Sequence, residues 1–164
     1  LFKRESSGSL ACNANHAINE ALALEGHELS GRGIQVEKAL DESIPLLQMD
    51  AHQLQQVLLN LIANAVDAMR PVVDRNRILR VSSEVKDSHA ILAVHDTGTG
   101  IAPEDMEKIF EPMFTTKGAG MGMGLWICRA IVESYGGQLK TRSRINEGSI
   151  FQIELPIDNV THHR

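Results

Sequence analysis

The most regular hydrophobic pattern in the chain runs from Gln53 to Met69. On a helix, with about 100° between successive residues, its aliphatic side chains share one face, and these are Leu54, Val57, Leu58, Leu61, Ile62, Ala65 and Met69. A polar stripe follows the other side and consists of Gln56, Asn60, Asn64 and Asp67. Asn is a poor helix former because its amide competes for backbone hydrogen bonds. Two Asn one turn apart in mid-helix therefore indicate a role beyond helix stability, although a partly exposed face with two chance Asn explains this stretch alone equally well.

The signals around this central helix give its limits. Asp50 is a good N-cap, with Gln53 as its predicted capping-box partner. The helix is expected to end before Pro71, because the residue ahead of a proline disfavours helical backbone angles. Short amides such as those of the polar stripe offer neutral oxygens at a fixed height, which suits a hydrated Mg²⁺ and its phosphates.

The remaining pattern predicts helices that are segregated from hairpins. Further helices are expected over 9–29, 103–109 and from 121 or 122 to 135, and strands over 33–40, 46–49, 77–85, 89–95, 138–143 and 148–155. Residues 96–100 and 110–120 are expected to be loops. This pattern predicts an α+β fold, a two-layer α/β sandwich with about three helices on one face of a mixed, mostly antiparallel sheet. We expect a lead-in at 1–8, one domain at 9–156 and a tail at 157–164.

Composition narrows the class of protein without identifying it. The 164 residues fit one domain, and the 4% aromatic content predicts an aliphatic core. The net charge of −5 argues against a nucleic-acid surface, and no apolar run approaches the roughly 18 residues of a membrane span, so no membrane contact is expected. Cys12 and Cys128 have no metal-ligand spacing and are expected to be reduced, in the cytoplasm. The chain opens on Leu1, which favours a piece of a longer protein that can itself be membrane-anchored.

The first glycine-rich stretch follows a predicted strand. That strand delivers Asp96 to a loop that contains Gly98 and Gly100. Glycine allows a ligand to lie against the main chain, and a carboxylate at such a loop can accept a hydrogen bond from an exocyclic amine such as that of adenine. A strand-end turn with an Asx motif is the more common explanation for this stretch on its own.

The second glycine-rich stretch begins at Thr115. Here glycines alternate over seven residues and lead into a helix, at Gly118, Gly120, Gly122 and Gly124. Without side chains, consecutive N–H groups can point into an anion site, to which the helix N-terminus adds partial positive charge. Lys117 and the Thr hydroxyls add donors. The pattern is neither a P-loop nor a dinucleotide fingerprint. A flexible linker is the alternative, but linkers rarely run straight into an amphipathic helix, so a phosphate cradle is favoured.

Four sequence motifs together resemble a known family. They are QQVLLNLIANAVDA, DTGTG, FEPMFTTK and GAGMGMGL, followed by a closing hairpin, GGQLKTRSRINEGSIFQIELP. In order and spacing they resemble the Asn box, first glycine box, Phe box and second glycine box of the ATP-binding catalytic domain of sensor histidine kinases. That domain belongs to a superfamily with gyrase, a heat-shock chaperone and the mismatch-repair ATPases. The resemblance covers roughly residues 9 to 156.

The resemblance implies a role for particular residues. Asn64 matches the Mg²⁺-binding Asn, Asn60 lies near the phosphates, and Asp96 matches the acid that reads adenine, which would sit between Asp96 and Ile101, Val66 and Leu125. Residues 110–120 match a mobile ATP lid. Asn60 and Lys117 are implied to act on the transferred phosphoryl group. The implied nucleotide site consists of Asn60, Asn64, Asp67, Asp96, Gly98, Gly100, Ile101, Thr116, Lys117, Gly118, Gly120, Gly122, Gly124, Leu125 and Ser149.

Three positions depart from the family pattern. Asp67 stands where many histidine kinases carry Lys, and Thr97 stands where Asn is usual, which leaves the role of that side chain open. Asn60 stands where the hydrolytic relatives carry a Glu that activates water. Because an amide cannot take a proton from water, this position favours phosphoryl transfer over ATP hydrolysis.

The phosphoacceptor motif of the family, a His followed by an acidic residue in a dimerising helix hairpin, has no match in the chain. His16 is followed by Ala17, and His27 precedes Glu28 but lies too close to the catalytic domain. The resemblance therefore predicts a domain that binds Mg²⁺ and ATP and phosphorylates a His on a separate dimerisation/acceptor domain of its parent, with a response regulator downstream. The alternatives are a stand-alone protein-serine kinase of the anti-sigma-factor type, a non-catalytic nucleotide-binding module and an ATP hydrolase.

Overall fold

A computed structural model describes residues 10–112 and 121–157 and gives no side-chain detail for 121–123. One five-stranded sheet forms the base of the molecule, in the order β1-β2-β3-β5-β4. The strands are β1 (Ile34–Ala39), β2 (Arg77–Lys86), β3 (His89–Asp96), β4 (Gln138–Arg144) and β5 (Gly148–Pro156). β1 pairs in parallel with β2, and the other three pairings are antiparallel. The mixed, mostly antiparallel sheet of the sequence prediction is confirmed.

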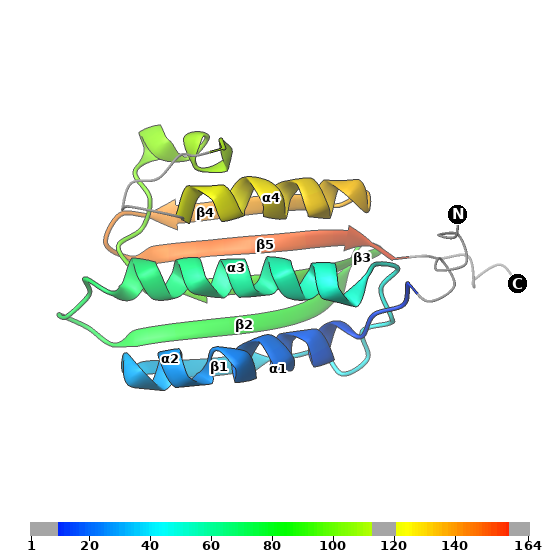
Figure 1. Cartoon of the computed structure of the whole chain (residues 1–164), viewed down its shortest axis with the longest axis horizontal. Helices are drawn as coiled ribbons and strands as arrows, with labels where there is room; N and C mark the ends of the chain where they lie inside the picture. The colour runs from blue at the N-terminus through cyan, green and yellow to red at the C-terminus, as the bar shows by residue number, and fades with distance from the viewer. Residues whose placement is uncertain (1–9, 113–120, 158–164) are drawn as a thin grey trace, which may run out of the picture.

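The helices form a second layer on one face of this sheet (Figure 1). They are α1 (Ala14–Leu24), α2 (Gly26–Gly31), α3 (Ala51–Met69) and α4 (Met121–Ser134), and the chain between β3 and α4 contains two 3₁₀ turns, η2 (Pro103–Asp105) and η3 (Lys108–Phe110). α3 lies between α1 and α4 (Figure 1). The predicted α+β sandwich, with three long helices on one face, is confirmed. Among the described helices, none is long and apolar enough to cross a membrane.

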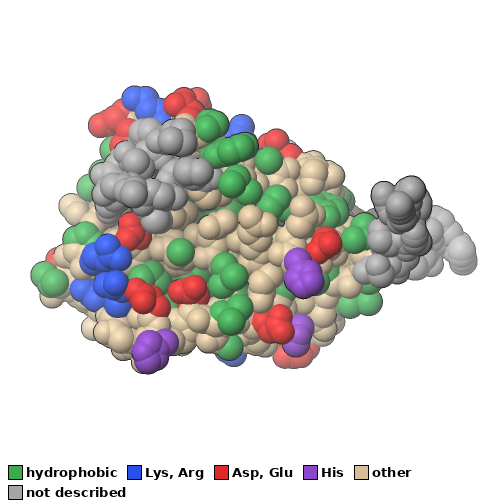
Figure 2. Space-filling model, in the orientation of Figure 1, with side chains coloured by type: hydrophobic (Ala, Val, Ile, Leu, Met, Phe, Trp, Pro, Cys, Tyr) green, Lys and Arg blue, Asp and Glu red, His purple; other side chains and the backbone are tan. Residues whose placement is uncertain are grey.

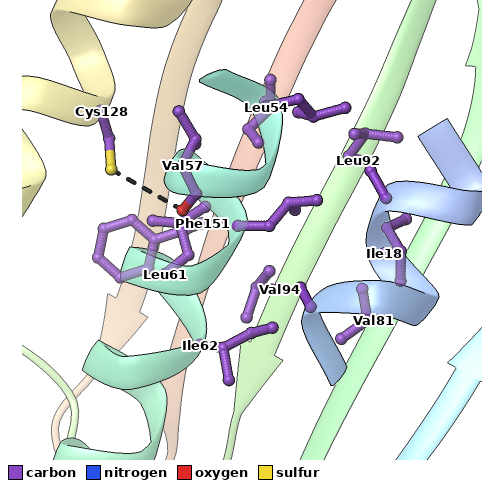
Figure 3. Packing of buried hydrophobic residues seen from close by; sticks show 14 of the residues in the cluster. Ile18, Leu54, Val57, Leu61, Ile62, Val81, Leu92, Val94, Cys128 and Phe151 are labelled. Carbon is purple, nitrogen blue, oxygen red and sulfur yellow. Dashed lines mark hydrogen bonds between the residues drawn. The ribbon is translucent and has the colours of Figure 1, made fainter. Parts of the chain in front are cut away.

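The core lies between α3 and the sheet and is aliphatic, as the composition predicts. Every residue of the predicted apolar face of α3 is buried, and Leu54, Leu58 and Met69 are 0% exposed. Burial of a Leu or Ile side chain contributes about 1.5–3 kcal/mol relative to exposure. Phe151 of β5 belongs to the same hydrophobic cluster, which extends to Ile18 of α1 (Figure 3). The amphipathic helix is therefore the central element of the core.

The first predicted helix is wrong in its start and in its continuity. It begins at Ala14, because Asn13 accepts a 2.9 Å hydrogen bond from the backbone N–H of His16 and acts as the N-cap. The helix then breaks at Glu25 ahead of Gly26, which is a poor helix former, and resumes as α2. The expected strand over 46–49 is only an isolated bridge, in which Leu47 pairs with Cys12.

Two other local predictions also need correction. Residues 103–109 form no α-helix, and the 3₁₀ turns η2 and η3 replace it, since seven residues barely exceed the costly helix nucleus. At the start of α3, Asp50 caps the backbone N–H groups of His52 and Gln53 as predicted. The Gln53 side chain does not return to Asp50; it accepts from the Tyr135 hydroxyl, which itself accepts the Asp50 N–H at 3.3 Å.

Parts of the predicted organisation lie outside the described residues. These are residues 113–120 of the expected lid and nearly all of the expected lead-in and tail. The division at 9 and 156 remains a prediction.

Candidate functional site

Asn60, in the polar stripe of α3, lies against the start of α4. Asn60, Asn64 and Asp67 are each partly exposed, in contrast to the buried residues beside them. A Cβ atom on Gly124 would lie only 3.0 Å from Asn60 Oδ1, so any larger residue would press on this amide. The structure therefore brings Asn60 and Gly124 together, as the predicted site requires.

Cys128 lies one turn after Gly124 on α4 and also borders Asn60. Its side chain is 0% exposed, and its Sγ lies 3.8 Å from the carbonyl oxygen of Val57 (Figure 3). Burial raises the pKa of this thiol to about 11, although a hydrogen bond with Asn60 offsets part of the effect. The thiol therefore stays protonated at neutral pH and acts as a weak donor. Cys128 was not predicted to be a neighbour of Asn60, and only its helical spacing from Gly124 could have indicated it.

Asn64 carries a buried polar atom without a partner. Its Nδ2 is sealed from solvent and makes no hydrogen bond within the described part of the chain. Buried amides are nearly always paired, because an unpaired one costs about 1–3 kcal/mol. The same amide carries an oxygen, Oδ1, and an amide oxygen is a good ligand for a hard cation such as Mg²⁺. The chemistry of this residue thus fits the implied metal.

Asp67, at the end of the stripe, is not a free carboxylate. It forms a 3.1 Å ion pair with Arg70, and its side chain is only 16% exposed. The stripe therefore ends in an acid whose charge is already balanced by a neighbouring guanidinium.

Asp96 ends β3 and is a buried carboxylate, 2% exposed. Its Oδ1 accepts a 2.8 Å hydrogen bond from the N–H of Gly98, within the same turn. Burial raises the pKa of Asp96 to about 6, and backbone hydrogen bonds from Gly98 and Ser149 limit the rise. Ser149 stands opposite Asp96 in the sheet and is also buried, with its Oγ 2.9 Å from Ser143 Oγ. The predicted adenine-reading acid thus lies in a dry position that favours a specific hydrogen bond.

The glycines of the 96–101 loop are required by contacts within the protein. A Cβ on Gly98 would lie 2.7 Å from backbone atoms of Ala68 in α3. Gly100 has a φ of +78°, and a Cβ there would lie 2.1 Å from the carbonyl oxygen of Arg144. These glycines are predicted from the sequence to let a ligand lie against the main chain, and in the structure the position of a Cβ on each is taken by the protein's own main chain.

Thr97, whose role the sequence left open, ties this loop to the start of β2. Its Oγ1 accepts from the N–H of Ile78 at 2.9 Å and lies 2.9 Å from the carbonyl oxygen of Asn76. The hydroxyl thus serves as the hydrogen-bond partner of two backbone groups, the Ile78 N–H and the Asn76 carbonyl, beside the end of β3.

The flanking apolar residues differ in their accessibility. Ile101 is partly buried, while Leu125 and Val66 are 7% and 4% exposed. Thr116, Lys117, Gly118 and Gly120 lie outside the described residues, and Gly122 is described only as part of α4. The described part of the site forms where the C-terminal half of α3, the end of β3 and the start of α4 meet, at one end of the molecule (Figure 1).

This fold and this arrangement match a known family. The model of the histidine kinase-, DNA gyrase B- and HSP90-like ATPases matches residues 49–159. The chain belongs to this family of ATPase domains.

Curated proteins that the chain resembles include sensor histidine kinases. The chain is 38% identical over 148 residues to the sensor histidine kinase ZraS of Salmonella typhimurium, a match that covers 88% of this chain and 30% of ZraS. It therefore spans less than a third of the length of this relative.

Solved structures agree with this placement. The catalytic domain of the histidine kinase ThkA has a TM-score of 0.78 at 34% identity, over 89% of this chain and 93% of that one. ThkA in complex with the response regulator TrrA has a TM-score of 0.76 at 30% identity, over 94% and 42% of the two chains. Full-length ShkA in complex with AMPPNP has a TM-score of 0.79 at 26% identity, over 89% and 30%.

Proposed function

We propose that this chain is the catalytic domain of a sensor histidine kinase, which binds Mg²⁺-ATP and phosphorylates a His on a separate dimerisation/acceptor domain of its parent. A response regulator would then receive the phosphoryl group. The observation that carries the proposal is the buried carboxylate of Asp96. Asp96 ends β3, and that end of β3 lies at the same end of the molecule as the C-terminal end of α3, the helix that carries Asn60 and Asn64 (Figure 1). The likeness to ZraS, to ThkA with its response regulator and to ShkA with AMPPNP supports it.

At the adenine end, Asp96 would accept a hydrogen bond from the exocyclic amine. The pKa of about 6 leaves this carboxylate mostly ionised at neutral pH and therefore able to accept. Ile101 and Leu125 would flank the base, and Gly98, Gly100 and Ser149 would hold the carboxylate and its loop.

At the phosphate end, Asn64 would hold Mg²⁺, and Asn60 and Asp67 would lie near the phosphates. A metal held there would supply positive charge that offsets the negative charge of the phosphates. Gly124 leaves room beside Asn60, which a side chain would take. The contributions of Thr116, Lys117, Gly118, Gly120 and Gly122 remain predictions from the sequence.

The chemistry would be transfer rather than hydrolysis. A nitrogen of the acceptor imidazole would attack the γ-phosphorus, the bond to the β-phosphate oxygen would break, and ADP would leave with that electron pair. The imidazole N–H proton would pass to solvent. Phosphoryl transfer needs positioning and charge neutralisation more than covalent help. The amide of Asn60 cannot act as a base toward water, so hydrolysis would not compete effectively.

We place this domain in the cytoplasm, where ATP is available. Its Cys12 and Cys128 are both free and buried, which is compatible with a reducing compartment. Whether its parent protein is anchored in a membrane is independent of this proposal.

The metal assignment is tested by Asn64→Ala, with Gln56→Ala as the matched control. Gln56 belongs to the same stripe two turns earlier and is exposed. Titration calorimetry should show about 10- to 100-fold weaker binding of Mg²⁺-ATP to Asn64→Ala, nearly unchanged binding of ADP without metal, and no change for Gln56→Ala. Equal losses for both ligands would contradict the metal role.

The transfer reaction is tested by incubating the chain with labelled ATP and the acceptor domain of its parent. We expect a phosphoprotein whose label is lost in acid, since phosphohistidine is acid-labile. An acid-stable product would instead indicate the serine-kinase alternative. Release of free phosphate without the acceptor would indicate a hydrolase, and nucleotide binding without either product would indicate a non-catalytic module.

A further inference from the structure

Arg75, in the connection between α3 and β2, points its guanidinium at the glycine loop that follows Asp96. Its Nη2 donates to the carbonyl oxygen of Gly98 at 2.8 Å and to that of Thr97 at 3.1 Å. Its Nη1 forms a 3.1 Å ion pair with Asp74, and the Arg75 side chain is 32% exposed. Basic side chains gather at this edge of the helix-covered face, over the C-terminal end of α3 (Figure 2). One guanidinium thus serves both peptide carbonyls that directly follow Asp96.

The later part of the loop is held by regular elements of the fold. The N–H of Thr99 donates to the carbonyl of Ala68 in α3 at 3.0 Å, and the carbonyl of Thr99 accepts from the N–H of Asn146 at 2.7 Å. The N–H of Ile101 donates to Ser143 Oγ at 2.7 Å. These partners come from α3 and from the β4–β5 hairpin, so this part of the loop would keep its place if Arg75 were lost.

The first two carbonyls of the loop have a different donor. Arg75 is the donor that the described part of the chain supplies to both Thr97 O and Gly98 O. The N–H of the same Gly98 donates to Asp96 Oδ1. Gly98 is therefore held on one side by the Arg75 guanidinium and holds the Asp96 carboxylate on the other.

We infer that Arg75 is a positioning residue for base recognition, which fixes the Gly98 peptide and through it the orientation of the Asp96 carboxylate. The inference rests on the proposed function, in which Asp96 reads the exocyclic amine of adenine. Arg75 contacts the loop through the carbonyl oxygens of Thr97 and Gly98, which belong to the adenine end of the proposed site. Its loss should therefore reduce discrimination between bases more than it reduces the binding of phosphates.

Arginine suits this task better than lysine. Its planar guanidinium offers five donors in a fixed geometry, so it can bind two adjacent carbonyls and still pair with Asp74. The ammonium of a lysine is a flexible point donor that can serve one carbonyl well. A conservative Arg75→Lys variant should therefore keep part of the effect.

The test compares the affinities for Mg²⁺-ATP and Mg²⁺-ITP, because hypoxanthine carries a carbonyl in place of the exocyclic amine. We expect Arg75→Ala to bind ATP about 10-fold more weakly and ITP almost unchanged, so that the ATP preference falls. Arg75→Lys should fall in between, with KM for ATP raised and kcat for transfer retained. Arg80→Ala is the matched control, since Arg80 lies on β2 in an exposed ion pair with Glu37, 3.4 Å long, and should keep the full preference.

Two results would overturn the inference while leaving the proposed function intact. One is an equal loss of ATP and ITP affinity in both Arg75 variants, which would indicate only a structural role. The other is that both variants bind ATP and ITP with wild-type affinity. Failure of the proposed function would look different, because the wild-type chain would then bind neither nucleotide or Asp96→Asn would keep the wild-type preference. Arg75→Lys keeps the test decisive should Arg75→Ala fail to fold.

Discussion

The carboxylate of Asp96 is only 2% exposed, and its burial makes the stability of the folded chain depend on pH. Burial raises its folded-state pKa to about 6, above the ordinary value of 3.8. Between these two values the folded chain holds a proton that the unfolded chain has lost, so stability falls as pH rises through this range. Ionised Asp96 therefore opposes folding at neutral pH. Retaining such a group is typical of a functional site rather than of a core.

The pH dependence of stability tests this cost. Since Asn does not titrate, the free energy of unfolding of wild type relative to Asp96→Asn should fall as pH rises from 4 to 7, by up to about 3 kcal/mol. Urea unfolding of both proteins without nucleotide, at intervals of pH, measures this difference. Its slope is independent of any constant offset caused by the new amide. Parallel stability curves for the two proteins would show that Asp96 does not titrate in this range.

At the scale of residues, the site residues that can be predicted from the sequence are those whose chemical type is unusual for their position. Asn60 and Asn64 stand out in mid-helix, and Asp96 stands out beside glycines, so each was a candidate before any contact was known. Cys128 and Arg75 carry no such signal. Their relation to the site depends on which atoms the folded chain brings within hydrogen-bond distance, and Arg75 lies outside every motif.

At the scale of elements, the Tyr135 hydroxyl joins α3 to the chain segment that follows α4. It accepts the Asp50 N–H at 3.3 Å and donates to the side-chain oxygen of Gln53. The Tyr135 hydroxyl thus bridges Asp50 and Gln53, the two residues of the predicted capping box. Because the first N–H groups of a helix have no partner within it, this contact fixes the N-terminus of α3 at the end opposite to the candidate site (Figure 1).

Removal of this hydroxyl should affect stability and spare ligand binding. Tyr135→Phe leaves the Asp50 N–H and Gln53 side chain without their partner, which should cost about 1–2 kcal/mol. Ser134→Ala is the control, because its Oγ donates only to the nearby carbonyl of Ile131 at the surface. Chemical unfolding measures the loss and nucleotide titration the binding. A Tyr135→Phe variant as stable as Ser134→Ala would show that the hydroxyl contributes nothing.

The helices and strands with the clearest hydrophobic periodicity were predicted best. α3, α4 and both hairpins have clear periods, and their limits fell within a few residues of the prediction. The weak cases were short: residues 103–109 formed 3₁₀ turns, and residues 46–49 formed one bridge. In segments of this length a few tertiary contacts outweigh any local propensity.

At the scale of the molecule, pattern and motif order predicted the sandwich but not the order of its strands. Hairpins can be predicted because β2–β3 and β4–β5 are adjacent in sequence. The parallel β1–β2 pair and the β3–β5 pair join distant segments, and only the folded chain shows them. The β3–β5 pair is the one that sets Ser149 opposite Asp96. The site therefore depends on a pairing to which the local sequence gives no clue.

Because the proposed ligand would contact α3, the end of β3 and the start of α4 together, its binding should stabilise the whole domain. At a free concentration 100 times its Kd, a ligand specific for the folded state adds about 2.7 kcal/mol. For a domain of this size that corresponds to a rise in Tm of roughly 5–10 °C. Thermal unfolding with and without Mg²⁺-ATP measures the shift. Gln56→Ala should keep this shift and Asp96→Asn should lose it. The Asp96 carboxylate faces three donors, namely the Gly98 N–H, the Ser149 N–H and, in the proposed complex, the adenine amine. The amide of Asn has only one oxygen, so in every orientation its NH₂ group would face at least one of these donors and be repelled. A full shift in Asp96→Asn would mean that the nucleotide binds without this carboxylate.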